Sequence, residues 1–195
     1  MKISAQEALH IIVSVLTISL AFSFVQQGIS LGGHVPVFDF SNFFAVLVTV
    51  GLGFILHELA HKYVAISNGT HAEYHAWTLG LLAAIVMAVS VGFVFAAPGA
   101  VYIYGNVSRE KNGWISLAGP LTNLALAIVF LLVYFLVPGL HDIGIMGAYV
   151  NTFLGLFNML PFGPLDGKKV ADWSPKVWLA TFASLALIFL GLIAV

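Results

Sequence analysis

Two histidines and a glutamate lie within one turn of an otherwise apolar segment, residues 54–61, with the sequence FILHELAH. Because His57 and His61 are four positions apart, they share one face of a helix and can bind one tetrahedral metal ion together. Glu58 adjoins them and is placed to take a proton from a water at that metal. Each ionisable side chain inside a membrane helix costs about 2.5–3.5 kcal/mol on insertion scales, so three within one turn predict a functional site.

A catalytic zinc ion usually takes three protein ligands, so a third must come from elsewhere in the chain. The candidates in or beside apolar segments are Asp166, His10, His71 and His75. Asp166 lies among prolines and glycines (residues 161–167) that break a helix and leave unwound backbone beside the carboxylate. His10 is expected at the membrane interface. His71 and His75 are expected in a polar loop, where a weak peripheral metal site is the alternative to a solvated surface.

The rest of the chain has the composition of a membrane protein. Hydrophobic residues make up 61% and charged residues 8% of the 195 positions, whereas soluble globular chains average about 25% charged residues. Most of such a surface must face lipid. The lack of cysteine excludes disulfides and thiolate metal sites, and a net charge of −1 without a basic patch gives no reason to expect nucleic-acid binding. The predicted fold class is an all-α multi-pass membrane protein.

Five apolar segments are expected to cross the membrane as helices. Four are long, and a fifth is shorter and richer in Gly and Asn; in chain order they are Ala8–Val25, Phe43–Ile66, Trp114–Val137, Ile143–Phe162 (the short one) and Val177–Val195. The first is interpreted as a retained span, because its apolar run is too long for a signal peptide.

The apolar segment Leu79–Ala97, between the second and third crossings, is predicted to dip into the membrane and return. A Pro-Gly pair further suggests a β-hairpin over Phe93–Ile103. With five crossings and a cytoplasmic N-terminus, all seven Lys and Arg residues fall on the cytoplasmic side, as the positive-inside rule favours. The spans that carry His57 and Asp166 then run in the same direction, which brings both side chains to one depth, as a shared metal requires. The site is therefore expected within the membrane, toward its cytoplasmic side.

These residues resemble the site-2 proteases, a family of zinc-dependent intramembrane metalloproteases. Three motifs match in order over about residues 43–170: His57–His61, Ala118–Asn123 with the sequence AGPLTN, and Asn158–Gly167 ending in Leu-Asp-Gly. The resemblance implies that His57, His61 and Asp166 bind one zinc ion per chain and that Glu58 activates the water. It also implies a partner: a transmembrane segment of another protein, cut within or near the membrane.

The resemblance implies two further roles in binding this substrate. Asn158 matches a position near the substrate-binding cleft of the family, where it is expected to donate a hydrogen bond to the substrate backbone or to the developing oxyanion. The strands expected near Phe95–Ile103 resemble strands of the family that present an edge to an unwound substrate.

The chain is expected to form a single membrane-embedded metalloprotease core over residues 1–195. The loop His141–Gly144 leaves no room for a PDZ domain, and no CBS domain follows Val195. Only one crossing is expected after Asp166, which puts a gate of additional C-terminal helices in doubt and is also compatible with a truncated chain.

Three other functions compete with intramembrane hydrolysis. A zinc transporter or metal-binding membrane protein would use the same ligands, with Glu58 as a ligand or relay, but no repeated pair of motif-bearing helices accompanies the site. A non-hydrolytic homologue that only binds client helices would not need all four key residues. Prenyl-protein zinc proteases would leave the Leu165-Asp166-Gly167 motif unexplained, and no serine or paired-aspartate chemistry is encoded in the spans.

Overall fold

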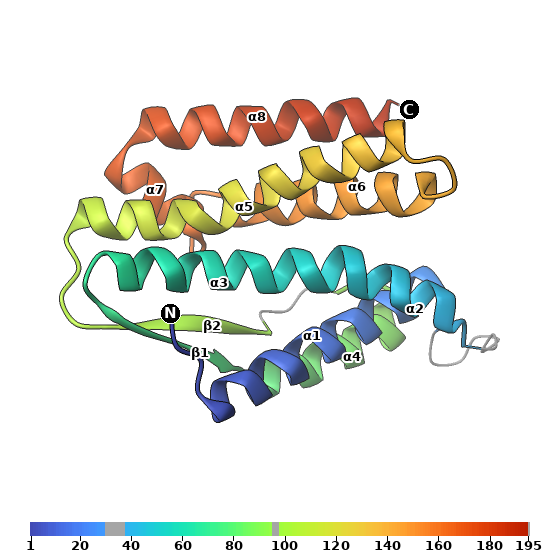
Figure 1. Ribbon diagram of the computed structural model, residues 1–195, viewed down its shortest axis with the longest axis horizontal. Helices are drawn as coiled ribbons and strands as arrows, with labels where there is room; N and C mark the ends of the chain where they lie inside the picture. The colour runs from blue at the N-terminus through green and yellow to red at the C-terminus, as the bar shows by residue number, and fades with distance from the viewer. Residues whose placement is uncertain (30–37, 95–97, 195) are drawn as a thin grey trace. The chain divides into compact units, whose positions relative to one another are not determined.

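The computed structural model describes residues 1–29, 38–94 and 98–194. These residues form mainly helices, with two short strands between the second and third long helical stretches, so the predicted all-α fold class is confirmed. The elements, shown in chain order in Figure 1, are α1 (Ala5–Gln26), α2 (Phe40–Val46), the π-helical turn η1 (Leu47–Gly51), α3 (Leu52–Ser67), β1 (His71–Ala76), α4 (Thr78–Val91), β2 (Gly99–Tyr104), α5 (Arg109–Leu136), α6 (His141–Asn158), α7 (Asp166–Trp173) and α8 (Pro175–Ile193).

Four helical stretches of the described residues are long and apolar enough to cross a membrane: α1, the run Phe40–Ser67 that joins α2, η1 and α3, and the helices α5 and α8. They coincide with the four long predicted spans, although Val195 of the last prediction lies outside the described residues. The fifth predicted span corresponds to α6, an 18-residue helix with polar residues at both ends. Helix α4 has 14 residues and, at about 1.5 Å per residue, is shorter than the roughly 30 Å hydrocarbon core. The number of crossings and their orientation stay predictions.

The chain forms two compact units. The first comprises Met1–Ile55 and Glu73–Tyr102, and the second comprises Leu56–Ala72 and Ile103–Val195. Each unit is therefore discontinuous in sequence. The first turn of α3 is part of the first unit, and the rest of the helix is part of the second.

In the first unit, α1 packs against α4 and η1, and its N-terminal half carries a buried polar network. The carboxylate of Glu7, which is 3% exposed, accepts a hydrogen bond from the backbone N–H of Tyr74 (3.0 Å). The Tyr74 hydroxyl donates to Ser14 Oγ (2.8 Å), and Ser14 in turn donates to the carbonyl of Pro98 (3.3 Å). Side chains of α1 and β1 thereby satisfy backbone groups of this unit that are shielded from water.

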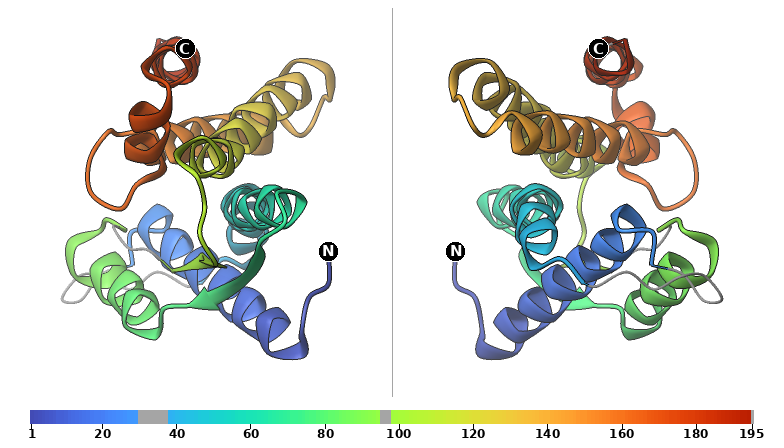
Figure 2. Two further views of the ribbon diagram at one scale, coloured as in Figure 1. Left: turned by 90° about the vertical axis from the view of Figure 1, so that its left-hand side faces the viewer. Right: turned by 90° about the vertical axis from the view of Figure 1, so that its right-hand side faces the viewer.

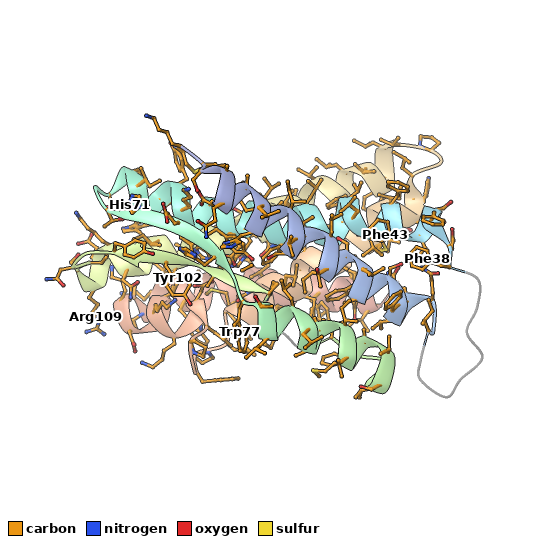
Figure 3. All side chains as sticks on the ribbon, turned by 90° about the horizontal axis from the view of Figure 1, so that it is seen from below. Phe38, Phe43, His71, Trp77, Tyr102 and Arg109 are labelled. Atoms are coloured by element: carbon orange, nitrogen blue, oxygen red, sulfur yellow. The ribbon has the colours of Figure 1, made fainter. Side chains whose placement is uncertain are left out.

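The strands β1 and β2 pair as a two-stranded antiparallel sheet. At one end the Trp77 N–H donates to the Pro98 carbonyl (3.0 Å), and at the other the rings of His71 and Tyr104 contact each other, with 5.5 Å between their centroids. Figure 3 labels His71 at the start of β1, Trp77 directly after its end and Tyr102 on β2. In this register the N–H of Tyr74 points away from β2, which explains why Glu7 is the group that accepts from it.

The predicted hairpin over Phe93–Ile103 is wrong in its pairing. Strand β2 pairs with β1, and helix α4 lies between these two strands in the sequence. The Pro98-Gly99 pair stands at the start of β2, where it ends the connection from α4. Residues 95–97 of that prediction lie outside the described residues. The segment predicted to be a polar loop, around His71 and His75, is in fact β1.

In the second unit, α5 and α6 lie side by side, joined by the short connection 137–140, and α8 lies beside α6 (Figures 1 and 2). The short helix α7 contacts α5 and α8. Leu117, Met159, Val170 and Leu185 form a buried apolar cluster between these helices. The indole N–H of Trp178 donates to the Met159 carbonyl (2.7 Å), which ties the unwound backbone after α6 to α8. This packing fixes the start of α7.

Candidate metal centre

His57 and His61 lie one turn apart on the part of α3 that belongs to the second unit. Both are buried, with 5% and 8% of their surface exposed. Their Nε2 atoms face each other at 2.9 Å. The four-residue spacing in a helix places the two imidazoles on one face, as predicted.

Asp166 is the first residue of α7 and brings the third donor to this pair. Its Oδ2 atom lies 3.3 Å from His57 Nε2 and 3.1 Å from His61 Nε2, and the side chain is nearly as buried as the two histidines. Among the described residues, these three form the one group of His, Asp or Glu side chains whose donor atoms all lie within 4.8 Å of one another.

The spacing of the three donors fits a tetrahedral metal ion. Zinc binds imidazole nitrogen and carboxylate oxygen at about 2.0–2.2 Å, so two ligand atoms of a tetrahedral site are about 3.3–3.5 Å apart. The observed separations of 2.9, 3.1 and 3.3 Å between His57, His61 and Asp166 are close to that edge. Two nitrogens and one oxygen are also the donor set of catalytic zinc sites that leave a fourth position open.

The outer nitrogen of each imidazole is held by a hydrogen-bond acceptor. Nδ1 of His57 lies 2.6 Å from Oδ1 of Asn123, and Nδ1 of His61 lies 2.7 Å from the carbonyl of Ile115. A carbonyl oxygen only accepts, so the Nδ1 atom of His61 donates to it, and in the neutral imidazole the Nε2 atom would present its lone pair to a bound metal. With Nδ1 of each ring facing an acceptor, the two Nε2 atoms are the nitrogens that would bind a shared metal ion.

Two glycines make room for this cluster. A Cβ atom at Gly119 of α5 would overlap Nε2 of both histidines, and a Cβ atom at Gly167 would overlap the backbone carbonyl of Met159. Gly119 thus lets α5 approach the ligand nitrogens, and Gly167 lets α7 begin against the unwound backbone after α6. Gly119 was not predicted as a site residue. Its place in the AGPLTN motif was the available signal for a closer role.

The charge of Asp166 is stabilised by its surroundings. Burial alone would raise the pKa of the carboxyl, but the Coulombic effect of His61 and hydrogen bonds with His57 and His61 lower it well below its ordinary value. The Nζ atom of Lys169, one turn along α7, lies 3.6 Å from the other carboxylate oxygen. The carboxylate is therefore ionised, which is the form that binds a metal.

Glu58 and Asn158, the other predicted site residues, are both half-buried in the second unit. Glu58 follows His57 on α3 and lies close enough to His61 to interact with it electrostatically. Asn158 is the last residue of α6, and its Nδ2 atom donates to the carbonyl of Leu154 (3.0 Å). One N–H of that amide group is thus used within the helix, and Nδ2 carries a second.

The remaining histidine candidates do not join the cluster. His71 and His75 stand at the two ends of β1, and four residues of a strand span about 13 Å, too far for two ligands of one ion. His10 of α1 contacts His75 within the first unit, with 5.7 Å between ring centroids, and one of its ring nitrogens is buried without a hydrogen-bond partner. Because a strand replaces the predicted loop, the two histidines cannot form the shared peripheral metal site.

Two buried asparagines near the centre were not predicted as site residues. Asn123 of α5 appeared only as the last residue of a matched motif, and Asn151 of α6 was not singled out. Both are fully buried. The available signal was the residue type, because an amide side chain inside an apolar helix needs a hydrogen-bond partner.

A buried pair of histidines on a helix long enough to cross a membrane, joined by one aspartate, is the candidate metal centre of a membrane protein. Comparison with known proteins agrees with this class. The chain is 44% identical over 181 residues to "Putative zinc metalloprotease MJ0611" of Methanocaldococcus jannaschii, covering 91% of this chain and 89% of that protein. It is 30% identical over 147 residues to "Putative zinc metalloprotease YwhC" of Bacillus subtilis, covering 65% and 67% of the two chains. The chain therefore belongs to this family of zinc metalloproteases.

A more distant relative carries the name "Zinc metalloprotease MJ0392", also from Methanocaldococcus jannaschii, and is 29% identical over 138 residues. This match covers 67% of the present chain and 34% of that longer protein. No family model matches the chain, and no solved structure matches it.

Proposed function

We propose that the chain is an intramembrane zinc protease of the site-2 type, which hydrolyses a peptide bond in or near a transmembrane segment of another membrane protein. The observation that carries the proposal is the convergence of Asp166 on His57 and His61, two residues of a helix run that is apolar and long enough to span the bilayer. Ionisable groups at such depth are expensive and usually functional. The zinc metalloprotease names of the relatives support the same reaction class.

The three donors would hold the ion, one zinc per chain, and leave a fourth position for the reaction. When bound there, zinc supplies a Lewis acid that polarises the scissile carbonyl and makes water acidic near neutral pH. Glu58 takes the proton from the attacking water and returns it to the leaving amine. Asn158 uses its second amide N–H to hold the substrate backbone or the developing oxyanion.

The substrate must unwind before it is cut, because a helix shields its peptide bonds by hydrogen bonding and by side chains. An unwound segment can then pair with a strand edge. In the register of the sheet, the backbone groups of Val101 and Ile103 on β2 point away from β1, so β2 offers such an edge. The topology that places all basic residues on one side puts the N-terminus in the cytoplasm and the site toward that face.

The test compares the zinc content and the activity of matched variants of the full chain in detergent. Wild type should hold about one zinc per chain and cleave reconstituted membrane-protein substrates. Glu58→Gln should keep the zinc and lose cleavage by about 100- to 10,000-fold, the usual contribution of general acid–base catalysis. Asp166→Asn should lose zinc, whereas Asp172→Asn, an exposed carboxylate on the same helix paired with Lys168, should retain both zinc and activity.

Other results would contradict specific parts of the proposal. Zinc binding that is indifferent to Asp166 would remove the third ligand. A Glu58→Gln variant with normal cleavage would remove the general base. A wild-type chain that moves zinc across a vesicle membrane and cleaves nothing would favour a transporter.

A further inference from the structure

We propose that Asn151 of α6 is a positioning residue that determines which nitrogen of His57 faces the metal. This inference deepens the proposed function and rests on the zinc site described there. Asn151 does not itself belong to the group of three donors. It acts through Asn123, so that a hydrogen-bonded chain runs from α6 through α5 to α3.

The chain has three links within the second unit. Asn151 Nδ2 donates to the backbone carbonyl of Gly147 (2.9 Å). Asn123 Nδ2 donates to Oδ1 of Asn151 (3.1 Å), and Asn123 Oδ1 lies 2.6 Å from Nδ1 of His57. Both asparagine side chains have no exposed surface, so water does not compete for these bonds.

The donor and acceptor in every link follow from the acceptor at the start of the chain, the Gly147 carbonyl. The Gly147 carbonyl can only accept, so the amide of Asn151 must turn its NH₂ group toward it and its oxygen toward Asn123. Asn123 must then donate its own NH₂ group to that oxygen and present its oxygen to His57. His57 is left to donate from Nδ1, and its Nε2 atom carries the lone pair that a metal needs.

The bond from Asn123 to Asn151 bears on His57 because an amide side chain can present either its oxygen or its NH₂ group. The oxygen and the NH₂ group of Asn123 are nearly the same size, and a rotation of 180° about the terminal bond exchanges them. A reversed Asn123 would offer a donor to Nδ1 of His57, which favours the tautomer with a proton on Nε2 and blocks the metal. His61 is in a different position, because a backbone carbonyl, that of Ile115, holds its Nδ1 directly.

The decisive experiment measures zinc affinity by competition with a chromophoric chelator. Asn151→Leu removes the acceptor for Asn123 at similar volume and should weaken zinc binding by about 10- to 100-fold, the usual effect of losing an outer-shell partner of a metal ligand. Asn123→Asp in the same chain should restore most of the lost affinity, because a carboxylate accepts from Nδ1 of His57 in either orientation. Rescue by a second substitution distinguishes positioning from loss of packing.

The matched control is Thr152→Val on the same helix. The Thr152 hydroxyl is also fully buried, but its hydrogen bond goes to the carbonyl of Ala148 within α6. This variant should bind zinc as wild type does. The proposal is overturned if Asn151→Leu binds zinc as tightly as Thr152→Val, or if the double variant Asn123→Asp with Asn151→Leu is no tighter than Asn151→Leu alone.

A second measurement uses the wild-type chain without zinc, so it does not require any variant to fold. In the metal-free wild-type chain labelled with ¹⁵N-histidine, Nδ1 of His57 should carry a proton. A His57 imidazole with a proton on Nε2 and none on Nδ1 would overturn the inference. A wild-type chain that shows the Nδ1 proton but binds no zinc would contradict the proposed function alone, so the two failures are distinguishable.

Discussion

Gly119 of α5 faces the Nε2 atom of His61 at such short range that any side chain at position 119 would overlap the imidazole. The contact lies in a buried part of the second unit, where neighbouring helices leave little room to adjust. The close approach of α5 therefore depends on a residue without a Cβ atom, and this dependence can be tested without touching a ligand.

Gly119→Ala is expected to lower zinc affinity by at least about 10-fold, because the new methyl group displaces the ligand nitrogens from tetrahedral geometry. Alanine is the better helix former by about 1 kcal/mol, so helix propensity does not account for a loss. Zinc affinity by chelator competition is the measurement. Gly191→Ala on α8, where a Cβ atom would meet open space, should bind zinc as wild type does. Equal affinity in both variants would show that the space at position 119 is not needed.

Zinc affinity should fall as the pH is lowered, because protons compete with zinc for the two imidazoles but not for Asp166. Despite burial, the neighbouring histidines hold the pKa of the Asp166 carboxyl below its ordinary value, so this group stays ionised at a pH where an ordinary carboxyl would take up a proton. A group with a lowered pKa loses its charge only at a pH below that of an ordinary carboxyl, so Asp166 should add no proton to the competition in the range where imidazoles titrate. The affinity should therefore drop by up to about 100-fold per pH unit in acid, corresponding to two protons displaced per zinc ion. A dependence on three protons would mean that Asp166 titrates with the histidines.

Asp166→Glu offers a finer test of the third ligand than removal of the carboxylate. The longer side chain keeps the charge but moves the oxygen by about one methylene, and the start of α7 packs so closely on the Met159 carbonyl that position 167 has no room for a Cβ atom. Zinc should bind more weakly than in wild type but more tightly than in Asp166→Asn. Isothermal titration of the three chains gives the order, and an equal affinity in Glu and Asn variants would show that charge at this position contributes nothing.

Tyr74→Phe should destabilise the first unit without changing the metal centre. The Tyr74 hydroxyl is buried and donates to Ser14, and the loss of one such hydrogen bond typically costs about 1 kcal/mol. Thermal unfolding in detergent should begin at a lower temperature, with unchanged zinc content. Tyr63→Phe, an exposed tyrosine on α3, is the control and should melt as wild type does.

The parts of the molecule that follow from local spacing were predictable from sequence. Four-residue spacing places His57 and His61 on one helical face, and the helix-breaking residues before Asp166 indicated unwound backbone beside its carboxylate. The long apolar runs predicted the four long helical stretches to within a few residues.

The parts that depend on pairing between distant segments were not predictable in the same way. The Pro98-Gly99 pair does interrupt regular structure locally. Nothing in the neighbouring sequence indicates, however, that the strand after it pairs with His71–Ala76, which precedes α4 in the chain. Likewise, the sequences around Asn123 and Asn151 do not reveal that their amide groups meet, because the contact arises from the packing of α5 against α6.

The second unit is assembled from two stretches of chain, and the candidate metal centre takes its donors from both. His57 and Asp166 are more than a hundred residues apart in sequence. In a chain without cysteine, an ion held between them would be the cross-link that a disulfide otherwise provides, and it would close a long loop of sequence that includes Glu73–Tyr102 of the first unit. Metal binding at this site should then stabilise the folded chain as a whole. The metal-free chain should be cleaved faster by an added protease, even at peptide bonds remote from the catalytic residues.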